Sequence, residues 1–147
     1  MYKNFKKVFC TILIFVLAFS SSFSSMAFAA NDEVSTPYGL NKPTVYWDFD
    51  DGQYNFAGEA DYSDLYSEYL FTDASKVEIY VDNNHASKQL TVKLLKQIPY
   101  SVDWSQSTVK IPAGEDCKWE VNISADDTYI LKFSGPSDFD GYIKRVS

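Results

Sequence analysis

Residues 76–95 read KVEIYVDNNHASKQLTVKLL. From Lys76 to Asp82 every second residue is valine or isoleucine, and from Leu90 to Leu94 every second residue is leucine or valine. Alternation of this kind is typical of strands that bury one face. The polar residues between the two runs, NNHAS, are typical of a turn. We therefore predict an antiparallel hairpin with a loop of about five residues.

The same rhythm recurs on both sides of this stretch. Turn-forming residues follow at short intervals, among them Pro112-Ala113-Gly114, Asp126-Asp127 and Gly135-Pro136. No stretch has convincing helical periodicity, although 62–67 resembles one helical turn. The pattern predicts an all-β fold, an antiparallel β-sandwich that is jelly-roll-like, with seven to eight short strands. The predicted strands are 45–49, 65–71, 76–82, 90–94, 108–111 (led into by Val102 and Trp104), 118–123, 128–134 and 142–146.

The N-terminus has the features of a secretory signal peptide. Three lysines precede an apolar run, 8–19, which is shorter than the roughly 20 residues that span a bilayer. Ala27 and Ala29 then supply the small side chains of a cleavage site. We predict a signal peptide at 1–29, cleavage after Ala29, a flexible arm at 30–43 and one domain at 44–147. The localisation that follows is secreted, in the extracellular medium.

The charge of the chain excludes two classes of partner. The formal net charge is −7, and the predicted signal peptide removes lysines but no acids. A domain this acidic is repelled by nucleic acid and by anionic membranes. We therefore expect no nucleic acid partner and no membrane partner after signal cleavage.

Residues 76–147 carry a family resemblance. The segments STVKIPAGEDCKWEV and DDTYILKFSGPSDFDGYIKRV follow the hairpin, and a tyrosine strand, a glycine and a final strand succeed one another. This rhythm resembles small secreted bacterial β-sandwich modules of the pre-peptidase C-terminal type. The resemblance implies a binding or accessory module, and we expect this one, unlike the usual case, to stand alone without an attached enzyme.

The residues that commonly carry catalysis are few. After processing, Cys117 is the one cysteine, and it alternates with polar residues in step with Trp119 and Val121, which places it on the buried face of a strand. His85 is the one histidine and lies in the predicted hairpin loop, so neither a Cys-His pair nor a histidine metal cluster can form. Two carboxylates could hydrolyse a glycoside, but no pair stands out. We predict that the protein is not an enzyme.

An acidic segment suggests a metal. Residues 43–75 hold eight acids and no lysine or arginine, and the densest part is Asp48, Asp50 and Asp51. Calcium accepts irregular shells of six to eight oxygens, so these three carboxylates are candidate calcium ligands. The spacing is not that of an EF-hand. The alternative is a solvated acidic face that keeps the protein soluble, and Asp126-Asp127 and Asp138–Asp140 are explained by turn chemistry.

Aromatic residues supply the candidate ligand-binding side chains. Tyrosine and tryptophan on an exposed surface can pack against sugar rings while neighbouring polar groups bind the hydroxyls. Trp47, Tyr46, Tyr54 and Tyr80 are the candidates for such a surface. The alternative is that they fill the core or pair across strands, as the alternation predicts for Trp119.

Together these features predict a secreted, non-enzymatic binding or accessory module. Its partner class is a polysaccharide, the cell envelope or a protein, and calcium is the one cofactor that the sequence suggests. The alternative is a secreted structural or interaction protein that associates with itself or with a protein target through a sheet edge.

Overall fold

The computed structural model describes residues 41–147. The predicted signal peptide, 1–29, and residues 30–40 of the predicted arm lie outside this range. Within 41–147, no helix is both long and apolar enough to cross a membrane.

Ten strands and one short 3-10 helix follow one another in the described residues. They are β1 (Tyr46–Trp47), η1 (Phe49–Asp51), β2 (Tyr54–Ala60), β3 (Leu65–Tyr66), β4 (Leu70–Phe71), β5 (Lys76–Asn83), β6 (Leu90–Lys96), β7 (Trp104–Ile111), β8 (Asp116–Asn122), β9 (Tyr129–Ser134) and β10 (Ser137–Arg145).

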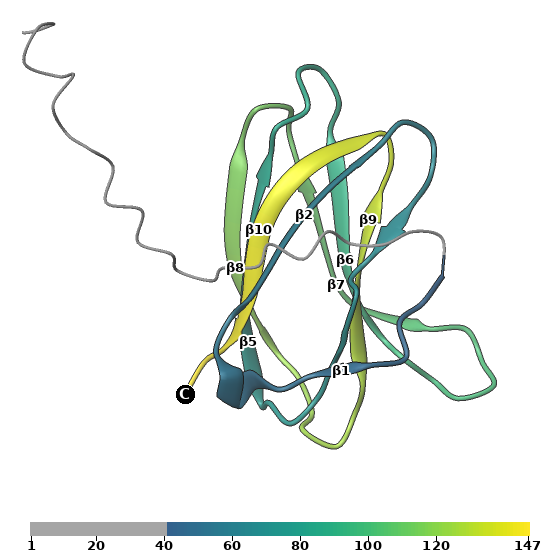
Figure 1. The fold of residues 1–147 in the computed structure, drawn as a ribbon, viewed down its shortest axis with the longest axis vertical. Helices are drawn as coiled ribbons and strands as arrows, with labels where there is room; N and C mark the ends of the chain where they lie inside the picture. The colour runs from purple at the N-terminus through teal and green to yellow at the C-terminus, as the bar shows by residue number, and fades with distance from the viewer. Residues whose placement is uncertain (1–40) are drawn as a thin grey trace, which may run out of the picture. The chain divides into compact units, whose positions relative to one another are not determined.

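The strands form two sheets that face each other (Figure 1). One sheet has the order β2-β10-β5-β8, and the other has the order β1-β4-β9-β6-β7 with β3 also paired to β9. Most consecutive strands lie in different sheets, and the resulting order is that of a jelly roll. The predicted all-β jelly-roll sandwich is therefore confirmed. One short pairing, β1 with β4, is parallel.

The predicted hairpin of 76–82 with 90–94 is wrong. β5 pairs with β8 and β10, whereas β6 pairs with β7 and β9, so the connection between them crosses from one sheet to the other. Asn83 holds this crossing, because its buried amide nitrogen donates to the carbonyls of Lys88, Ile111 and Pro112 at 2.9, 3.0 and 3.0 Å. Alternation predicts which face of a strand is buried, but it does not identify the neighbouring strand.

Three local expectations also differ from the structure. The predicted strand 65–71 is divided into β3 and β4 at Ser67, whose hydroxyl accepts from the Leu131 amide at 3.1 Å and donates to the Tyr69 carbonyl at 2.9 Å. Residues 65–66 of the predicted helical turn form β3. β2 was not predicted, because after Tyr54 and Phe56 its alternation ends in small and charged residues. Residues 41–147 therefore form ten strands, where seven to eight were predicted.

The core lies between the two sheets. The predicted inward residues of β5 are fully buried, and so are Leu131 and Phe133 of β9. The rings of Phe133 and Phe139 stack with their centroids 4.0 Å apart and join the two sheets. Cys117 and Trp119 face this core as predicted, but they are only partly buried because β8 is a sheet edge.

Candidate functional site

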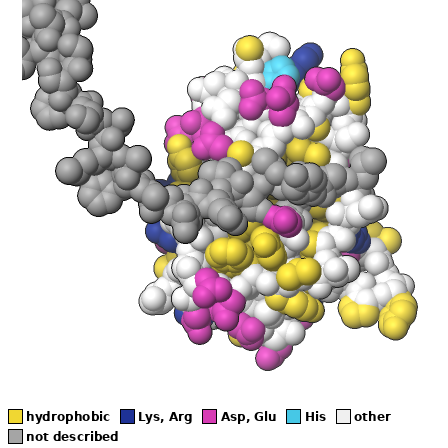
Figure 2. Space-filling model, in the orientation of Figure 1, with side chains coloured by type: hydrophobic (Ala, Val, Ile, Leu, Met, Phe, Trp, Pro, Cys, Tyr) yellow, Lys and Arg dark blue, Asp and Glu magenta, His cyan; other side chains and the backbone are white. Residues whose placement is uncertain are grey.

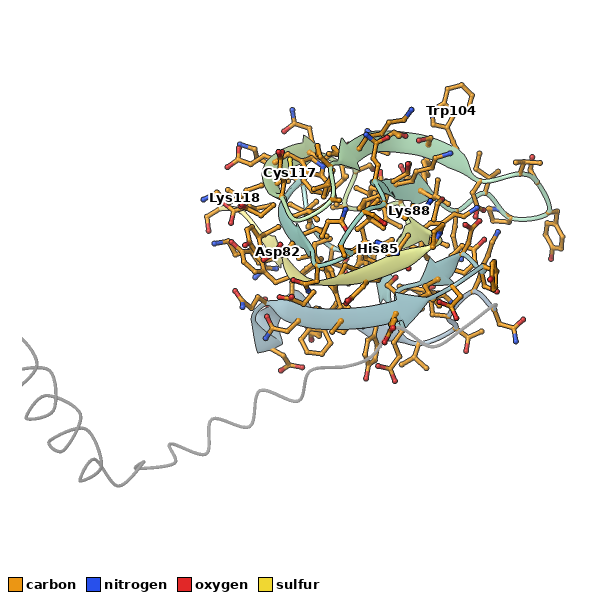
Figure 3. The ribbon with its side chains drawn as sticks, turned by 90° about the horizontal axis from the view of Figure 1, so that it is seen from above. Asp82, His85, Lys88, Trp104, Cys117 and Lys118 are labelled. Carbon is orange, nitrogen blue, oxygen red and sulfur yellow. The ribbon has the colours of Figure 1, made fainter. Side chains whose placement is uncertain are left out.

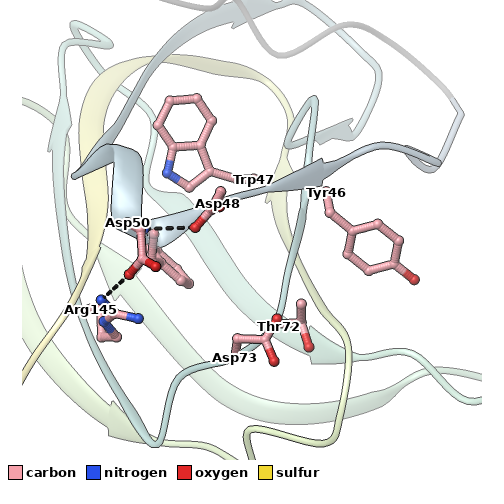
Figure 4. A pocket seen from close by; sticks show the side chains of 8 residues that line it. Tyr46, Trp47, Asp48, Asp50, Thr72, Asp73 and Arg145 are labelled. Atoms are coloured by element: carbon pink, nitrogen blue, oxygen red, sulfur yellow. Dashed lines mark hydrogen bonds and ion pairs between the residues drawn. The ribbon is translucent and has the colours of Figure 1, made fainter.

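A pocket of about 520 Å³ lies at one end of the sandwich. Strand β1 and helix η1 form one side of it, the connection between β4 and β5 forms another, and Arg145 from the last strand completes it (Figure 4). We call it the β1 pocket. Its lining residues are Tyr46, Trp47, Asp48, Phe49, Asp50, Thr72, Asp73 and Arg145.

Local hydrogen bonds shape the first side of the β1 pocket. The Asp48 Oδ1 accepts from the Asp50 amide at 2.8 Å and so caps η1. Gly52, at φ +104°, ends the turn in a conformation that favours glycine. The Trp47 Nε1 donates to the Gly52 carbonyl at 3.2 Å. These contacts explain why the chain bends sharply between β1 and β2.

Some aromatic residues of this region are buried beneath the β1 pocket, and others are exposed at its surface. Tyr54 is only 1% exposed, so the prediction that it lies on the binding surface is wrong. It packs in the core because inward alternation on β2 places its ring against Trp47 and Tyr69, with centroids 5.2 and 5.4 Å away. Trp47 is half-buried on top of this packing, and Tyr46 is 56% exposed. Tyr46 is therefore the aromatic ring with the most free area at the β1 pocket.

The other side of the β1 pocket is polar. Asp50 accepts from the Arg145 guanidinium at 2.5 Å, which brings a donor from the last strand to the first turn. Asp73 is exposed and has φ +58°. The Thr72 hydroxyl donates to the carbonyls of Ala125 and Asp127. The β1 pocket thus combines an exposed ring with carboxylates that accept hydrogen bonds and a guanidinium that donates them.

A second pocket of about 570 Å³ lies beside Tyr46, which lines both. The loop between β6 and β7 borders it, including Tyr100, which is fully exposed. Lys96 binds Asp127 at 2.6 Å at its margin. This hydrogen bond lowers the pKa of the Asp127 carboxyl and raises that of the Lys96 ammonium. Tyr46 consequently stands between two recesses at the same end of the sandwich.

No protein-family model, curated protein or solved structure matches this chain. The resemblance to pre-peptidase C-terminal modules therefore stays a prediction.

The structure partly assembles the predicted calcium ligands. Asp48 and Asp50 line the β1 pocket, but one caps η1 and the other pairs with Arg145. Asp51 lies in η1 and does not line the β1 pocket. Among residues 41–147, no three acidic, histidine or cysteine side chains come together in a group that could hold a metal ion. Calcium binding stays a prediction, and the structure assigns structural contacts to two of the three carboxylates.

Tyr80 lies apart from the β1 pocket. Its ring stacks on Tyr142 across the neighbouring strand with centroids 5.5 Å apart, on the outer face of the four-stranded sheet. The Tyr142 hydroxyl donates to Glu78 at 2.8 Å. Desolvation, followed by nearby aspartates including Asp116 and Asp82, raises the pKa of Tyr80. The cross-strand pairing that the sequence left open as an alternative describes Tyr80.

His85 and Cys117, both labelled in Figure 3, are not among the residues that line the two pockets. The His85 Nδ1 accepts from the amides of Ser87 and Lys88, both at 3.1 Å, and so shapes the crossing connection between β5 and β6. Sequence reasoning missed Thr72, Asp73 and Arg145 as lining residues. No sequence signal could have identified them, since they come from two distant segments that only the fold brings together.

Proposed function

We propose that the mature chain is a secreted, non-enzymatic binding module that holds a hydroxyl-rich ligand, such as a polysaccharide segment, in the β1 pocket. The observation that carries the proposal is the exposed Tyr46 ring beside the carboxylates of Asp48, Asp50 and Asp73 and the guanidinium of Arg145.

The chemistry of the β1 pocket suits such a ligand. The C–H face of a sugar ring packs against an aromatic ring, as other apolar surfaces do. Its hydroxyls both donate and accept hydrogen bonds, and the pocket supplies acceptors on Asp48 and Asp73 and a donor on Arg145. Jelly rolls include lectin domains, but the fold alone does not specify a function. The predicted export signal of residues 1–29 supports an extracellular ligand.

Two further observations support binding without catalysis. His85 and Cys117 line neither pocket. Asp48 and Asp50 already accept hydrogen bonds from the protein, which holds them as fixed acceptors. Carboxylates that are fixed in this way can orient the hydroxyls of a bound ligand.

Replacing Tyr46 by alanine is expected to weaken glycan binding about tenfold or more, since a central aromatic contact contributes roughly 1.4 kcal/mol or more. A glycan array with the purified protein would first identify a ligand, and titration calorimetry would then compare the dissociation constants. Tyr62→Ala is the matched control, because Tyr62 is 97% exposed and lines neither pocket.

Two results would contradict the proposal. One is the absence of any glycan ligand on the array. The other is an equal loss of affinity in the Tyr46 and Tyr62 variants, which would show that binding does not depend on the β1 pocket.

A further inference from the structure

β8 is the outermost strand of the four-stranded sheet and lies at its left margin in Figure 1. A backbone hydrogen bond at each end of the β5–β8 pair shows which residues of β8 bond to β5. At one end the Asn83 amide donates to the Glu115 carbonyl at 3.0 Å, and at the other the Ile123 amide donates to the Ser75 carbonyl at 2.9 Å. In an antiparallel ladder every second residue bonds the same neighbour. The odd-numbered residues of β8 therefore bond β5, and the even-numbered ones direct their backbone groups outward.

This outer edge is largely free in the described part of the chain. At its end, the Asn122 carbonyl accepts from the Gln106 side chain at 3.1 Å. No second strand pairs with β8 among residues 41–147. The backbone groups of Asp116, Lys118 and Glu120 thus form an open ladder, and such a ladder is a template for another strand.

The charges along this edge are complementary to those of the same edge in a second copy of the chain. Lys118 and Glu120 are both exposed and flank Trp119 symmetrically, and Glu120 also pairs with Lys76 of β5 in its own chain. In a two-fold antiparallel pair centred on Trp119, Lys118 of each copy lies opposite Glu120 of the other. Opposite charges at facing positions stabilise a strand pair. This register also makes Lys118 and Glu120 a hydrogen-bonded pair, as their outward backbone groups require.

The neighbouring registers of such a pair are electrostatically or geometrically less favourable. A pair centred on Lys118 or on Glu120 would place two like charges directly opposite each other, which is destabilising. A pair centred on Cys117 would match Asp116 with Lys118, but most of β8 would then face the turn residues 112–115. In the other sheet, the edge strand β7 has one charged residue, Lys110, and therefore no comparable preference.

We propose that a second copy of this chain binds along β8, antiparallel and centred on Trp119. The two four-stranded sheets then become one continuous sheet of eight strands. The axis is perpendicular to the sheet, so both cores stay on the same side and the partly buried Trp119 side chains become neighbours. Figure 3 shows Cys117 and Lys118 at the rim of the sandwich, where a second copy can approach. This surface is separate from the β1 pocket, and the proposal does not depend on the proposed function.

Charge reversal tests the surface. Lys118→Glu places a glutamate opposite Glu120 of the other copy, and Glu120→Lys places a lysine opposite Lys118. Each variant therefore creates two like-charge pairs per dimer and is expected to raise the dimer dissociation constant about tenfold or more. The double variant restores opposite charges and is expected to recover dimerisation. Sedimentation velocity over a range of concentrations measures the constant, and circular dichroism verifies folding. Lys110→Glu, which makes the same charge change on β7, is the control and is expected to leave the constant unchanged.

A disulfide tests the register. Centred on Trp119, Cys117 lies opposite Val121 of the other copy in a pair that is not hydrogen-bonded, with Cα atoms about 4.5 Å apart. Val121→Cys is therefore expected to give a disulfide-linked dimer under a mild oxidant. The two native thiols would be about four residues apart along the strands, roughly 13 Å, which is too far for a disulfide. The natural protein is consequently expected to dimerise without crosslinking and independently of reductant.

Each contrary result overturns the proposal. A protein that stays monomeric at the highest concentrations tested would show that β8 does not pair. If Lys110→Glu weakens the dimer as much as Lys118→Glu does, general charge and not this edge controls association. A crosslink through the native Cys117 would move the axis away from Trp119.

Discussion

Replacing Asn83 by aspartate is expected to lower the free energy of unfolding at pH 7 by on the order of 4 kcal/mol, since each buried polar group left without a partner costs about 1–3 kcal/mol. Asn83 is fully buried, and its amide nitrogen donates to three carbonyls from two connections. Aspartate has the same shape but puts a carboxylate oxygen against those carbonyls. The expected loss therefore measures hydrogen bonding and charge, not packing.

The pH dependence of this loss has a defined sign. Burial and facing carbonyl oxygens disfavour a carboxylate, so the pKa of the introduced aspartate would be raised above its unfolded value of about 3.9. The destabilisation is then smallest below that value and grows as the pH rises through the folded pKa. Urea unfolding at pH 4 and pH 7, each compared with the natural protein, is expected to show the larger difference at pH 7.

Asn122→Asp is the matched control, because Asn122 is exposed at the end of β8. It makes the same chemical change and is expected to alter stability by less than about 0.5 kcal/mol. If the Asn83 variant unfolded like this control, Asn83 would not hold the crossing between the sheets.

Replacing Gly141 by alanine is expected to destabilise the protein by on the order of 3 kcal/mol, at the upper end of what overpacking costs. Gly141 lies within β10, between Phe56 of β2 and Val81 of β5. A Cβ atom there would come within 2.1 Å of the Tyr80 carbonyl oxygen and 3.0 Å of the Phe56 ring. The carbonyl belongs to a central strand, so it cannot move away without disturbing the sheet.

Thermal unfolding of Gly141→Ala beside Gly114→Ala separates steric conflict from backbone strain. Gly114 has φ +71°, which disfavours alanine, but no atom lies within 4 Å of the added Cβ. Its variant is expected to lose about 1 kcal/mol from backbone strain alone. An equal or smaller loss at Gly141 would show that the close approach is relieved without cost.

Local patterns predicted the strands more reliably than the site. Alternation identified the buried face of β5 and β9, because a side-chain period of two follows from the extended backbone itself. It failed at β2, where the pattern is short, and at β3 and β4, where the Ser67 hydrogen bonds to distant β9 divide one predicted strand. Of the four aromatic candidates, Tyr46 and Trp47 line the β1 pocket, Tyr54 is buried and Tyr80 pairs with Tyr142.

The sequence by itself determined the fold class, the inward faces of the main strands and the acidic character of the chain, because each depends on a residue and its near neighbours. Only the tertiary structure decided which strands pair, and it placed β5 and β6 in different sheets. The tertiary structure also forms the β1 pocket, because it brings Arg145 to Asp50, which is 95 positions away in the chain. Such contacts depend on the packing of whole sheets, in which side chains from distant segments compete for the same interior positions. The periodicity of a strand depends only on near neighbours in the sequence, so it does not predict the outcome of that competition.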